Sequence, residues 1–137
     1  MNILLVDDER DVRTLIHDLL VPAGHSVTMA SSVLEAIVHV ELRRFDLVLL
    51  DLMMPGIDGF QFAEFMSSHW NTFETPVLIL SCRKDPESRS LARIYNCVGY
   101  LEKPFGPAEL LDAVHAAQER FHPAPGTPVR PARSTDR

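Results

Sequence analysis

The sequence predicts an α/β fold, in which an open, doubly wound sheet of five parallel strands carries helices on both faces. Five short runs rich in leucine, isoleucine and valine alternate with segments of helical periodicity, and repeated strand–helix units imply a parallel sheet. Several runs are almost continuously apolar, which is typical of strands covered on both faces. A closed eight-unit barrel takes ~250 residues. The chain has 137, so right-handed crossovers are expected to build an open sheet.

The strands and the amphipathic helices follow from the hydrophobic pattern in chain order. The expected strands are Asn2–Val6, Ser26–Met29, Asp46–Leu50, Pro76–Leu80 and Val98–Leu101. Apolar residues at helical spacing predict a helix after the first strand, with one buried face made of Val12, Leu15, Ile16, Leu19 and Leu20. The same spacing after the fifth strand predicts a last helix with Leu110, Leu111, Val114 and Phe121 on its buried face.

The other helices are predicted from the residues that begin them. Two pairs fit a capping box, in which a short polar side chain is followed three residues later by Glu or Gln: Ser32 with Glu35, and Asp58 with Gln61. Proline is favoured at the first position of a helix, and two prolines stand there: Pro86 and Pro107. Together these signals complete five strand–helix units.

Composition limits the domain count and the class of protein. A hydrophobic content of 46% in 137 residues allows one full core, so we expect one domain over residues 1–122 and a Pro/Arg-rich tail or linker over 123–137. The net charge of −6 argues against nucleic-acid binding by this chain. No apolar stretch is long enough to cross a membrane, and the N-terminus does not resemble a signal peptide. We therefore expect a cytoplasmic protein with two reduced cysteines.

Polar residues mark the ends of four of the predicted strands. Asp7 and Asp8 follow the first strand, Asp51 the third, Ser81 the fourth and Lys103 the fifth. Because ligands of open parallel sheets bind beyond the carboxyl ends of the strands, these side chains are expected to converge. Each could have an ordinary role, such as a helix cap or a surface charge. Their joint placement favours a site.

Such a set of groups points to phosphoryl chemistry. Three clustered carboxylates repel one another, and a hard divalent cation such as Mg²⁺ relieves the repulsion while it recruits phosphate oxygens. A carboxylate beside the cation can act as a nucleophile toward a phosphoryl donor. The metal, a lysine and a hydroxyl can then stabilise the transferred charge.

The ordered strings around these residues resemble the receiver domains of two-component response regulators. The strings are Leu5–Glu9, Asp51–Gly59 and Tyr100–Phe105, and the match runs from about Asn2 to Phe121. The resemblance implies a flavodoxin-like (βα)5 fold with the strand order 2-1-3-4-5. It also implies a cis peptide bond between Lys103 and Pro104, an isomer essentially restricted to bonds before proline.

The resemblance implies a role for each residue at the metal site. Asp51 would accept the phosphoryl group. Asp8 and Asp51 would bind Mg²⁺ directly, with Mn²⁺ as an alternative ion. The backbone carbonyl of Met53 would be a further ligand, and Asp7 would act through water.

Further residues would contact or sense the phosphoryl group. The resemblance implies contacts from Ser81, from Lys103 and from the backbone of Cys82. Ser81 and Tyr100 would form the switch that changes conformation. Receivers usually carry a very small residue after the serine, so Cys82 is a departure that predicts slowed phosphotransfer or slowed hydrolysis.

The implied function is a phosphorylation-dependent signalling switch that catalyses only its own phosphotransfer and dephosphorylation. A histidine kinase or histidine phosphotransfer protein would donate the phosphoryl group. The output surface, for a homodimer or an effector, would be the fourth helix, fifth strand and fifth helix, roughly residues 85–121.

Three alternatives were weighed against this interpretation. A pseudo-receiver would share the fold but bind partners without phosphorylation, and it remains the main alternative. An aspartate-nucleophile phosphatase would need a second acid two residues after Asp51, where the chain has Met53. A flavodoxin-like electron carrier would need a phosphate-cradling loop after the first strand, and Asp7 and Asp8 would repel phosphate there.

Overall fold

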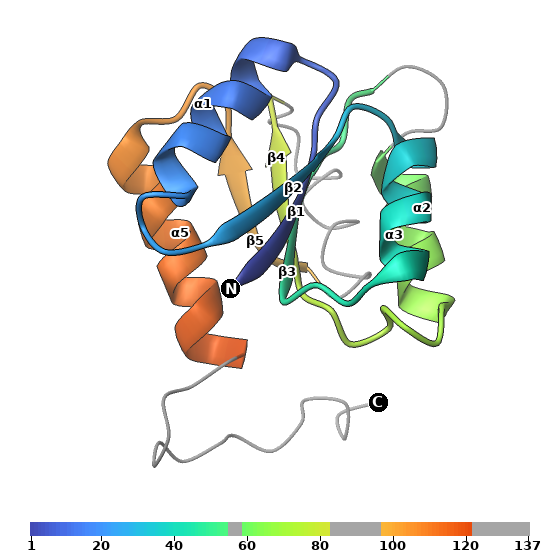
Figure 1. The fold of residues 1–137 in the computed structure, drawn as a ribbon. Helices are drawn as coiled ribbons and strands as arrows, with labels where there is room; N and C mark the ends of the chain where they lie inside the picture. Colours follow the sequence, from blue (N-terminus) through green and yellow to red (C-terminus); the bar gives the residue numbers. More distant parts are fainter. Residues whose placement is uncertain (55–58, 83–96, 122–137) are drawn as a thin grey trace.

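Five parallel strands form one sheet in the order β2-β1-β3-β4-β5 in the computed structural model of the chain, as predicted (Figure 1). The structure describes residues 1–54, 59–82 and 97–121. The strands are β1 (Asn2–Val6), β2 (Ser26–Ala30), β3 (Leu47–Asp51), β4 (Val77–Ser81) and β5 (Cys97–Glu102). The helices are α1 (Arg10–Leu20), α2 (Val33–Leu42), α3 (Gly59–Ser68) and α5 (Pro107–Phe121). The predicted helix starts at Asp58 and Pro86, and the tail over 123–137, lie outside the described residues.

Four of the five strands end one residue later than predicted, and in β3 and β4 the added residue is polar. The β3 strand includes Asp51, and the β4 strand includes Ser81. Pairing continues to this edge because Asp51 lies opposite Leu80 in the register, and Leu52 N donates to the Leu80 carbonyl at 3.2 Å. Both polar side chains are therefore held by regular strand backbone.

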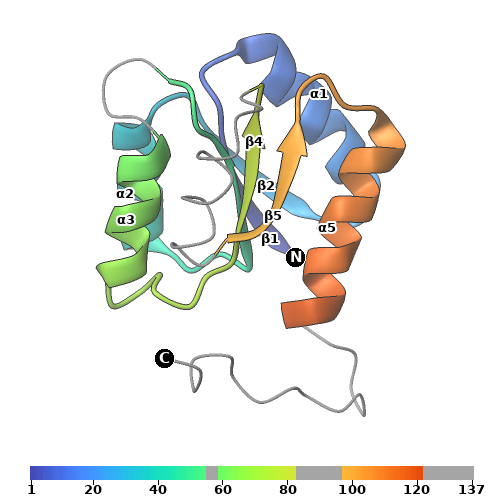
Figure 2. The same ribbon diagram turned by 180° about the vertical axis from the view of Figure 1, so that it is seen from behind.

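Two apolar cores lie on opposite faces of the sheet. Helices α2 and α3 cover one face, and α1 and α5 cover the other, as the opposite views in Figures 1 and 2 show. Alternate residues of β1 feed the two cores: Leu4 faces the α2–α3 side, and Leu5 faces the α1–α5 side. Burial of each such side chain stabilises the fold by about 1.5–3 kcal/mol. This explains why the central strands are apolar along their whole length.

The buried face of α1 is narrower than predicted. Ile16 and Leu20 are fully buried, but Leu15 is 49% exposed. With 3.6 residues per turn, Leu15 lies about 100° around the helix axis from Ile16 and is turned away from the sheet. The prediction that Leu15 lies on the buried face was therefore wrong.

The helix-start signals within the described residues are confirmed, with one shift. Ser32 Oγ accepts from Glu35 N at 3.2 Å, whereas the Glu35 carboxylate accepts from Ser31 N at 2.6 Å instead of from Ser32. Pro107 begins α5 as predicted. Among the described residues, no helix is both long enough and apolar enough to cross a membrane.

Candidate functional site

Three carboxylates meet at the carboxyl edge of the sheet, which we define as the edge where the strands end. Asp7 follows β1, Asp51 ends β3, and these two strands are paired neighbours. One oxygen each from Asp7, Asp8 and Asp51 lies within 4.8 Å of the others. Asp7 is 0% exposed and Asp51 is 3% exposed, while Asp8 is open to solvent. The predicted acidic cluster is thus formed, and two of its three members are buried.

Lys103 supplies the positive charge of the site. Its Nζ lies 2.7 Å from Asp7 Oδ2 and 3.5 Å from Asp51 Oδ2. Its backbone N–H donates to the Ser81 carbonyl at 3.0 Å, which ties the lysine to the end of β4. The peptide bond to Pro104 is cis, as predicted. The lysine predicted from the end of the fifth strand therefore reaches two of the three carboxylates.

Asp51 sits where its negative charge is disfavoured. Burial raises the pKa of this carboxyl from 3.8 to about 6. This value is the net result: the carboxylates of Asp7 and Asp8 act in the same direction as burial, whereas the N–H of Met53 and the charge of Lys103 act against it. Because the net effect is a raised pKa, the charged form of Asp51 is disfavoured, and an additional cation nearby would stabilise it.

Lys103 shows the complementary effect. Burial alone would lower its pKa, but the hydrogen bond to Asp7 and the charge of Asp51 outweigh burial and raise the pKa above its usual value. The Asp7 carboxylate is also fully used, because Oδ1 accepts from Glu9 N at 2.9 Å while Oδ2 accepts from Lys103. Asp7 therefore anchors the lysine, and Asp51 remains the buried acid with the weaker partner.

The loop after Asp51 is shaped by close backbone contacts. Met53 N donates to Asp51 Oδ1 at 3.0 Å, and the Met53 side chain is about half exposed. Gly59 N donates to the Leu52 carbonyl at 3.2 Å. A Cβ on Gly59 would stand 2.5 Å from the Asp51 carbonyl oxygen, so only glycine fits there. This glycine lets the start of α3 lie directly against the backbone of Asp51.

Ser81, Cys82 and Tyr100 lie at or near the same edge. Ser81 is fully buried at the end of β4, and Cys82 beside it is exposed. Tyr100 pairs with Ile79 in the β4–β5 register and packs, half buried, against the α2–α3 core. It is therefore two register positions from Glu102, which is the partner of Ser81, and the coupling of Ser81 with Tyr100 stays a prediction.

Two contacts were not predicted. Glu9 Oε1 lies 3.3 Å from Lys103 Nζ, which makes Glu9 a second, more exposed partner of the lysine. The Arg13 guanidinium donates to the Asp7 carbonyl at 2.7 Å and so holds the turn between β1 and α1. The spacing of Arg13 could have predicted its contact, because Arg13 lies one helical turn after Glu9, on the side of the helix that faces the preceding turn.

The donor set fits a hard divalent cation. Carboxylate and carbonyl oxygens are the ligands that Mg²⁺ and Mn²⁺ prefer. Asp8 and Asp51 are available for direct contact, whereas Asp7 is engaged by Lys103 and Glu9 N, which suits contact through water. The raised pKa of Asp51 is caused first by burial, which disfavours the charged carboxylate, and a bound cation would favour the charged form.

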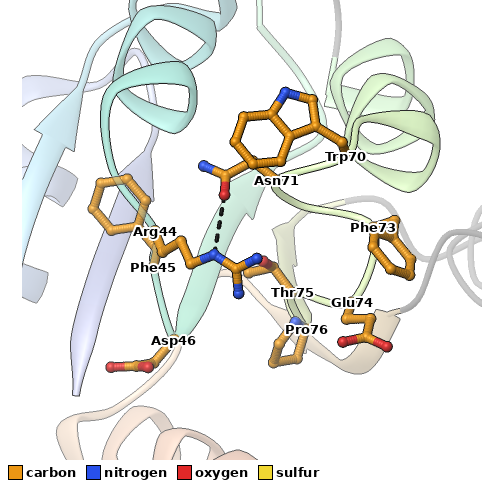
Figure 3. Close-up of a pocket in the computed structure, with 9 residues that line it drawn as sticks. All are labelled: Arg44, Phe45, Asp46, Trp70, Asn71, Phe73, Glu74, Thr75 and Pro76. Atoms are coloured by element: carbon orange, nitrogen blue, oxygen red, sulfur yellow. Dashed lines mark hydrogen bonds between the residues drawn. The ribbon is translucent and has the colours of Figure 1, made fainter.

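A hollow of about 270 Å³ lies at the opposite, amino edge of the sheet, where β3 and β4 begin (Figure 3). It is lined by Arg44, Phe45, Asp46, Trp70, Asn71, Phe73, Glu74, Thr75 and Pro76. Arg44 Nε donates to Asn71 Oδ1 at 3.0 Å, and Asp46 accepts from Asn2 N at 2.7 Å. Arg44 and Asp46 are hydrogen-bonded there, and the three clustered carboxylates lie at the other edge, so this hollow is separate from the acidic cluster.

Comparison with known proteins gives consistent matches over most of the chain. The family model described as the response regulator receiver domain matches residues 3–115. Response regulator MprA of Mycobacterium leprae is 35% identical over 90% of this chain and 53% of its own length. Protein PilG of Pseudomonas aeruginosa is 28% identical over 90% of this chain and 91% of its own length. The chain spans about half the length of most of the curated relatives it matches.

Solved structures agree with the fold. The chemotaxis protein CheY4 of Vibrio cholerae superposes with a TM-score of 0.81 at 30% identity, and the match covers 85% of this chain and 97% of that one. NtrX of Brucella abortus superposes with a TM-score of 0.80 at 29% identity, but only 26% of that longer chain is covered. The same domain therefore occurs both nearly alone and as part of larger proteins.

Proposed function

This chain belongs to the response regulator receiver domain family, and on that premise we propose that it is a Mg²⁺-dependent switch that is phosphorylated on Asp51. The family carries out phosphorylation-based signalling in two-component systems, with a kinase as phosphodonor. The observation that carries the assignment is the environment of Asp51. It is a buried carboxylate at a strand end with a lysine at 3.5 Å and two further acids beside it.

Asp51 is a better acceptor than the other two acids. Asp7 has both carboxylate oxygens engaged at 2.9 Å or less, by Glu9 N and by Lys103 Nζ. Asp8 is exposed, so water would compete for a phosphoryl group there. Asp51 combines burial with a neighbouring cation, which favours transfer by position and by charge stabilisation.

We assign the divalent cation to Asp8, Asp51 and the carbonyl of Met53, with Asp7 contributing through water. When bound, Mg²⁺ would neutralise carboxylate charge and help to hold phosphoryl oxygens. The protein's own groups do the rest. The Asp51 carboxylate oxygen forms the new bond to phosphorus as the bond to the donor's leaving group breaks, and Lys103 Nζ pairs with the incoming negative charge.

The transferred charge then acts on the residues near β4 and β5. Ser81 Oγ and the backbone N–H of Cys82 would donate to phosphoryl oxygens, and Tyr100 would change rotamer with the movement of Ser81. Local charge would thereby bias a two-state surface. We place the output on α5, β5 and the segment before it, although residues 83–96 lie outside the described part of the chain. The donor would be a histidine kinase or a histidine phosphotransfer protein.

The experiment is intact-mass spectrometry after incubation with acetyl phosphate and Mg²⁺. We expect one phosphoryl adduct in the wild type and none in Asp51→Asn or when Mg²⁺ is chelated. Asp46→Asn is the matched control, because Asp46 is an acid at the amino edge of the sheet, and it should be phosphorylated like the wild type. An adduct that persists in Asp51→Asn would disprove the assignment of the acceptor.

The alternative is a pseudo-receiver that binds partners without phosphorylation. The departure at Cys82 is the feature that favours it, because a larger side chain next to Ser81 could narrow access to Asp51. Beryllofluoride, which mimics a bound phosphoryl group, separates the two. If the wild type neither forms an adduct nor binds beryllofluoride while Cys82→Ala does both, access is blocked by that cysteine. If neither protein responds, the chain is a pseudo-receiver.

A further inference from the structure

Helix α2 carries an uncovered apolar stripe on its outer face. The stripe consists of Leu34, Val38 and Leu42, which are 65%, 55% and 76% exposed. Their spacing of four residues places them in one row along the helix. Single exposed apolar residues are common on protein surfaces, but a continuous row of three on a helix of 10 residues is not.

The inner face of the same helix is apolar as well. Val33, Ala36 and Val40 are buried against the sheet. A helix with apolar residues on two opposite faces is normally covered on both. Within the described residues, α2 is covered on its inner side by the sheet and flanked by α3 (Figure 1). The side chains of its outer row are exposed.

Trp70 extends the apolar surface beyond the end of α2. The turn that carries it is fastened to the last turn of the helix, because Asn71 Nδ2 donates to the Val40 carbonyl at 2.9 Å and His69 Nε2 lies 3.9 Å from Glu41 Oε2. Trp70 itself is 73% exposed. A further large apolar side chain is therefore exposed near the last turn of α2, and exposed apolar clusters often mark interaction sites.

The acids beside the stripe are held by partners in the same chain. Glu35 accepts from Ser31 N at 2.6 Å and from Ser31 Oγ at 3.0 Å. Glu41 is directed toward His69 on the α3 side. Both carboxylates are thus drawn to the flanks, so a partner could cover the row without burying an unpaired charge.

We propose that the α2 stripe is a self-association surface that takes a second copy of this chain. The row is symmetric about Val38, because Leu34 and Leu42 each lie four residues from it. A two-fold interface must bring residue i against j and j against i. Two antiparallel α2 helices with Val38 on the axis meet this requirement, since Leu34 would face the partner's Leu42 and Leu42 the partner's Leu34.

The area available suits a dimer of modest affinity. A stable interface buries roughly 800 Å² on each partner. The exposed side chains of the stripe and the nearby Trp70 would supply the apolar centre of such an interface, and the polar residues around them would supply its rim. This surface is distinct from the proposed output face on β5 and α5, and it requires neither phosphorylation nor a bound metal.

The first test is the mass of the full chain in solution, measured by sedimentation with chelator present. We expect a concentration-dependent dimer between ~1 and ~100 μM, the range in which a weak dimer dissociates. Val38→Lys should weaken it by ~100-fold or more, because two lysines would face each other across the axis. Leu15→Lys is the matched control: an exposed leucine on α1 changed to the same residue should leave the dimer intact. Circular dichroism checks that both variants are folded.

The second test is the register of the helices, measured by disulfide cross-linking in a Cys82→Ser background. Val38→Cys should link to itself under mild oxidation, since residues on the axis come within disulfide reach. Leu34→Cys should link to Leu42→Cys in a mixture and poorly to itself. A wild type that stays monomeric at ~100 μM, or a dimer that Val38→Lys leaves unchanged, would overturn the proposal. A monomer that instead captures its own residues 122–137 on the stripe would do the same.

Discussion

The carboxyl and amino edges of the sheet both carry charged residues, but they hold them differently. At the carboxyl edge, Asp7 and Asp51 are buried, and they share one lysine. At the amino edge, Arg44 and Asp46 lie near the surface, and each makes its own hydrogen bond, to Asn71 and Asn2 respectively. The carboxyl edge has more buried negative charge than Lys103 can balance. At the amino edge, each of the two charged side chains has a hydrogen-bond partner of its own.

This difference shows which part of the molecule contains an arrangement that is unfavourable for folding and therefore calls for a functional explanation. A buried carboxylate without a full partner is unfavourable, so its presence at a strand end needs a reason outside folding. The proposed cation and phosphoryl group provide that reason. Surface pairs of the kind at the amino edge are worth little to stability and need no such explanation. Substitutions at the two edges should therefore have different effects.

The largest difference in the free energy of unfolding between substitutions at the two edges should follow removal of Lys103. Lys103→Met would leave the fully buried Asp7 carboxylate without its 2.7 Å partner. Breaking a buried ion pair from one side costs about 3–5 kcal/mol. We expect a loss of about this size in the free energy of unfolding near neutral pH, measured by urea denaturation, and a smaller loss at acidic pH as the carboxylates become protonated.

Arg44→Met is the control for that substitution. It removes a cation of similar size from the amino edge, where the partner Asn71 is uncharged and reaches water. The expected change is within about 0.5 kcal/mol. Equal losses in the two variants would mean that the carboxyl edge is no more strained than an ordinary surface.

The next effect concerns the charge on Asp51 itself. Because burial raises its pKa from 3.8 to about 6 in the folded state, the folded protein binds this proton more tightly than the unfolded chain does. The contribution of this group to stability therefore falls as pH rises from about 4 to about 6, and it stays low above pH 6. With Asp51→Asn that penalty is absent. In chelator, the variant should gain about 2–3 kcal/mol on the wild type between pH 4 and pH 7.

The measurement is the difference in unfolding free energy between Asp51→Asn and the wild type, repeated across that pH range. Taking the difference cancels the titration of the acids that do not interact with Asp51. Asp46→Asn is the matched control, since that carboxylate lies at the amino edge, away from Lys103 and the acidic cluster. A flat difference for Asp51→Asn would indicate that Lys103 already balances the charge.

Added metal should produce a smaller stabilisation of the same edge. A cation that binds only the folded protein contributes about 1.4 kcal/mol at ten times its Kd. We expect Mg²⁺ to raise the unfolding free energy by this amount in the wild type. Asp8→Asn should lose the effect, because Asp8 is one of the two proposed direct ligands. If Ca²⁺ and Mg²⁺ act equally in the wild type and in Asp8→Asn, the effect is general ionic screening.

The comparison of the two edges also shows what the sequence could and could not predict. The fold followed from the apolar runs, and the acidic cluster followed from the rule that parallel strands end at one edge. The sequence pattern could not predict that Lys103 lies closer to Asp7 than to Asp51, because the two distances differ by less than an ångström and are set by packing. Nor could it predict the closeness of Gly59 to Asp51, since that contact depends on the path of a loop.

The α2 stripe was missed for a related reason. Periodicity identifies one apolar face of a helix, and α2 has two, so its pattern alone does not say which face meets the sheet. The same limit made Leu15 look buried on α1. In both helices the position of the sheet, which is a tertiary feature, decides which apolar residues are left exposed.

The smallest effect should come from a polar residue at the carboxyl edge that lies outside the cluster. Ser32 follows β2, the outermost strand on that side of the sheet, and its hydroxyl accepts from Glu35 N at 3.2 Å to cap α2. Loss of such a cap costs about 1 kcal/mol. Ser32→Ala should therefore lower the unfolding free energy by that amount, while Ser67→Ala, an exposed serine within α3, should change it by less than about 0.5 kcal/mol.

The decisive part of this last prediction is the response to metal. Ser32→Ala should keep the full stabilisation by Mg²⁺, because β2 is separated from β3 by β1 and the cap contacts none of the three carboxylates. If the variant lost that stabilisation, the site would extend along the whole carboxyl edge. The unfavourable buried charge could then not be limited to the ends of β1 and β3. Retention of the effect would confine the functional charge to those two strands and to the lysine that they share.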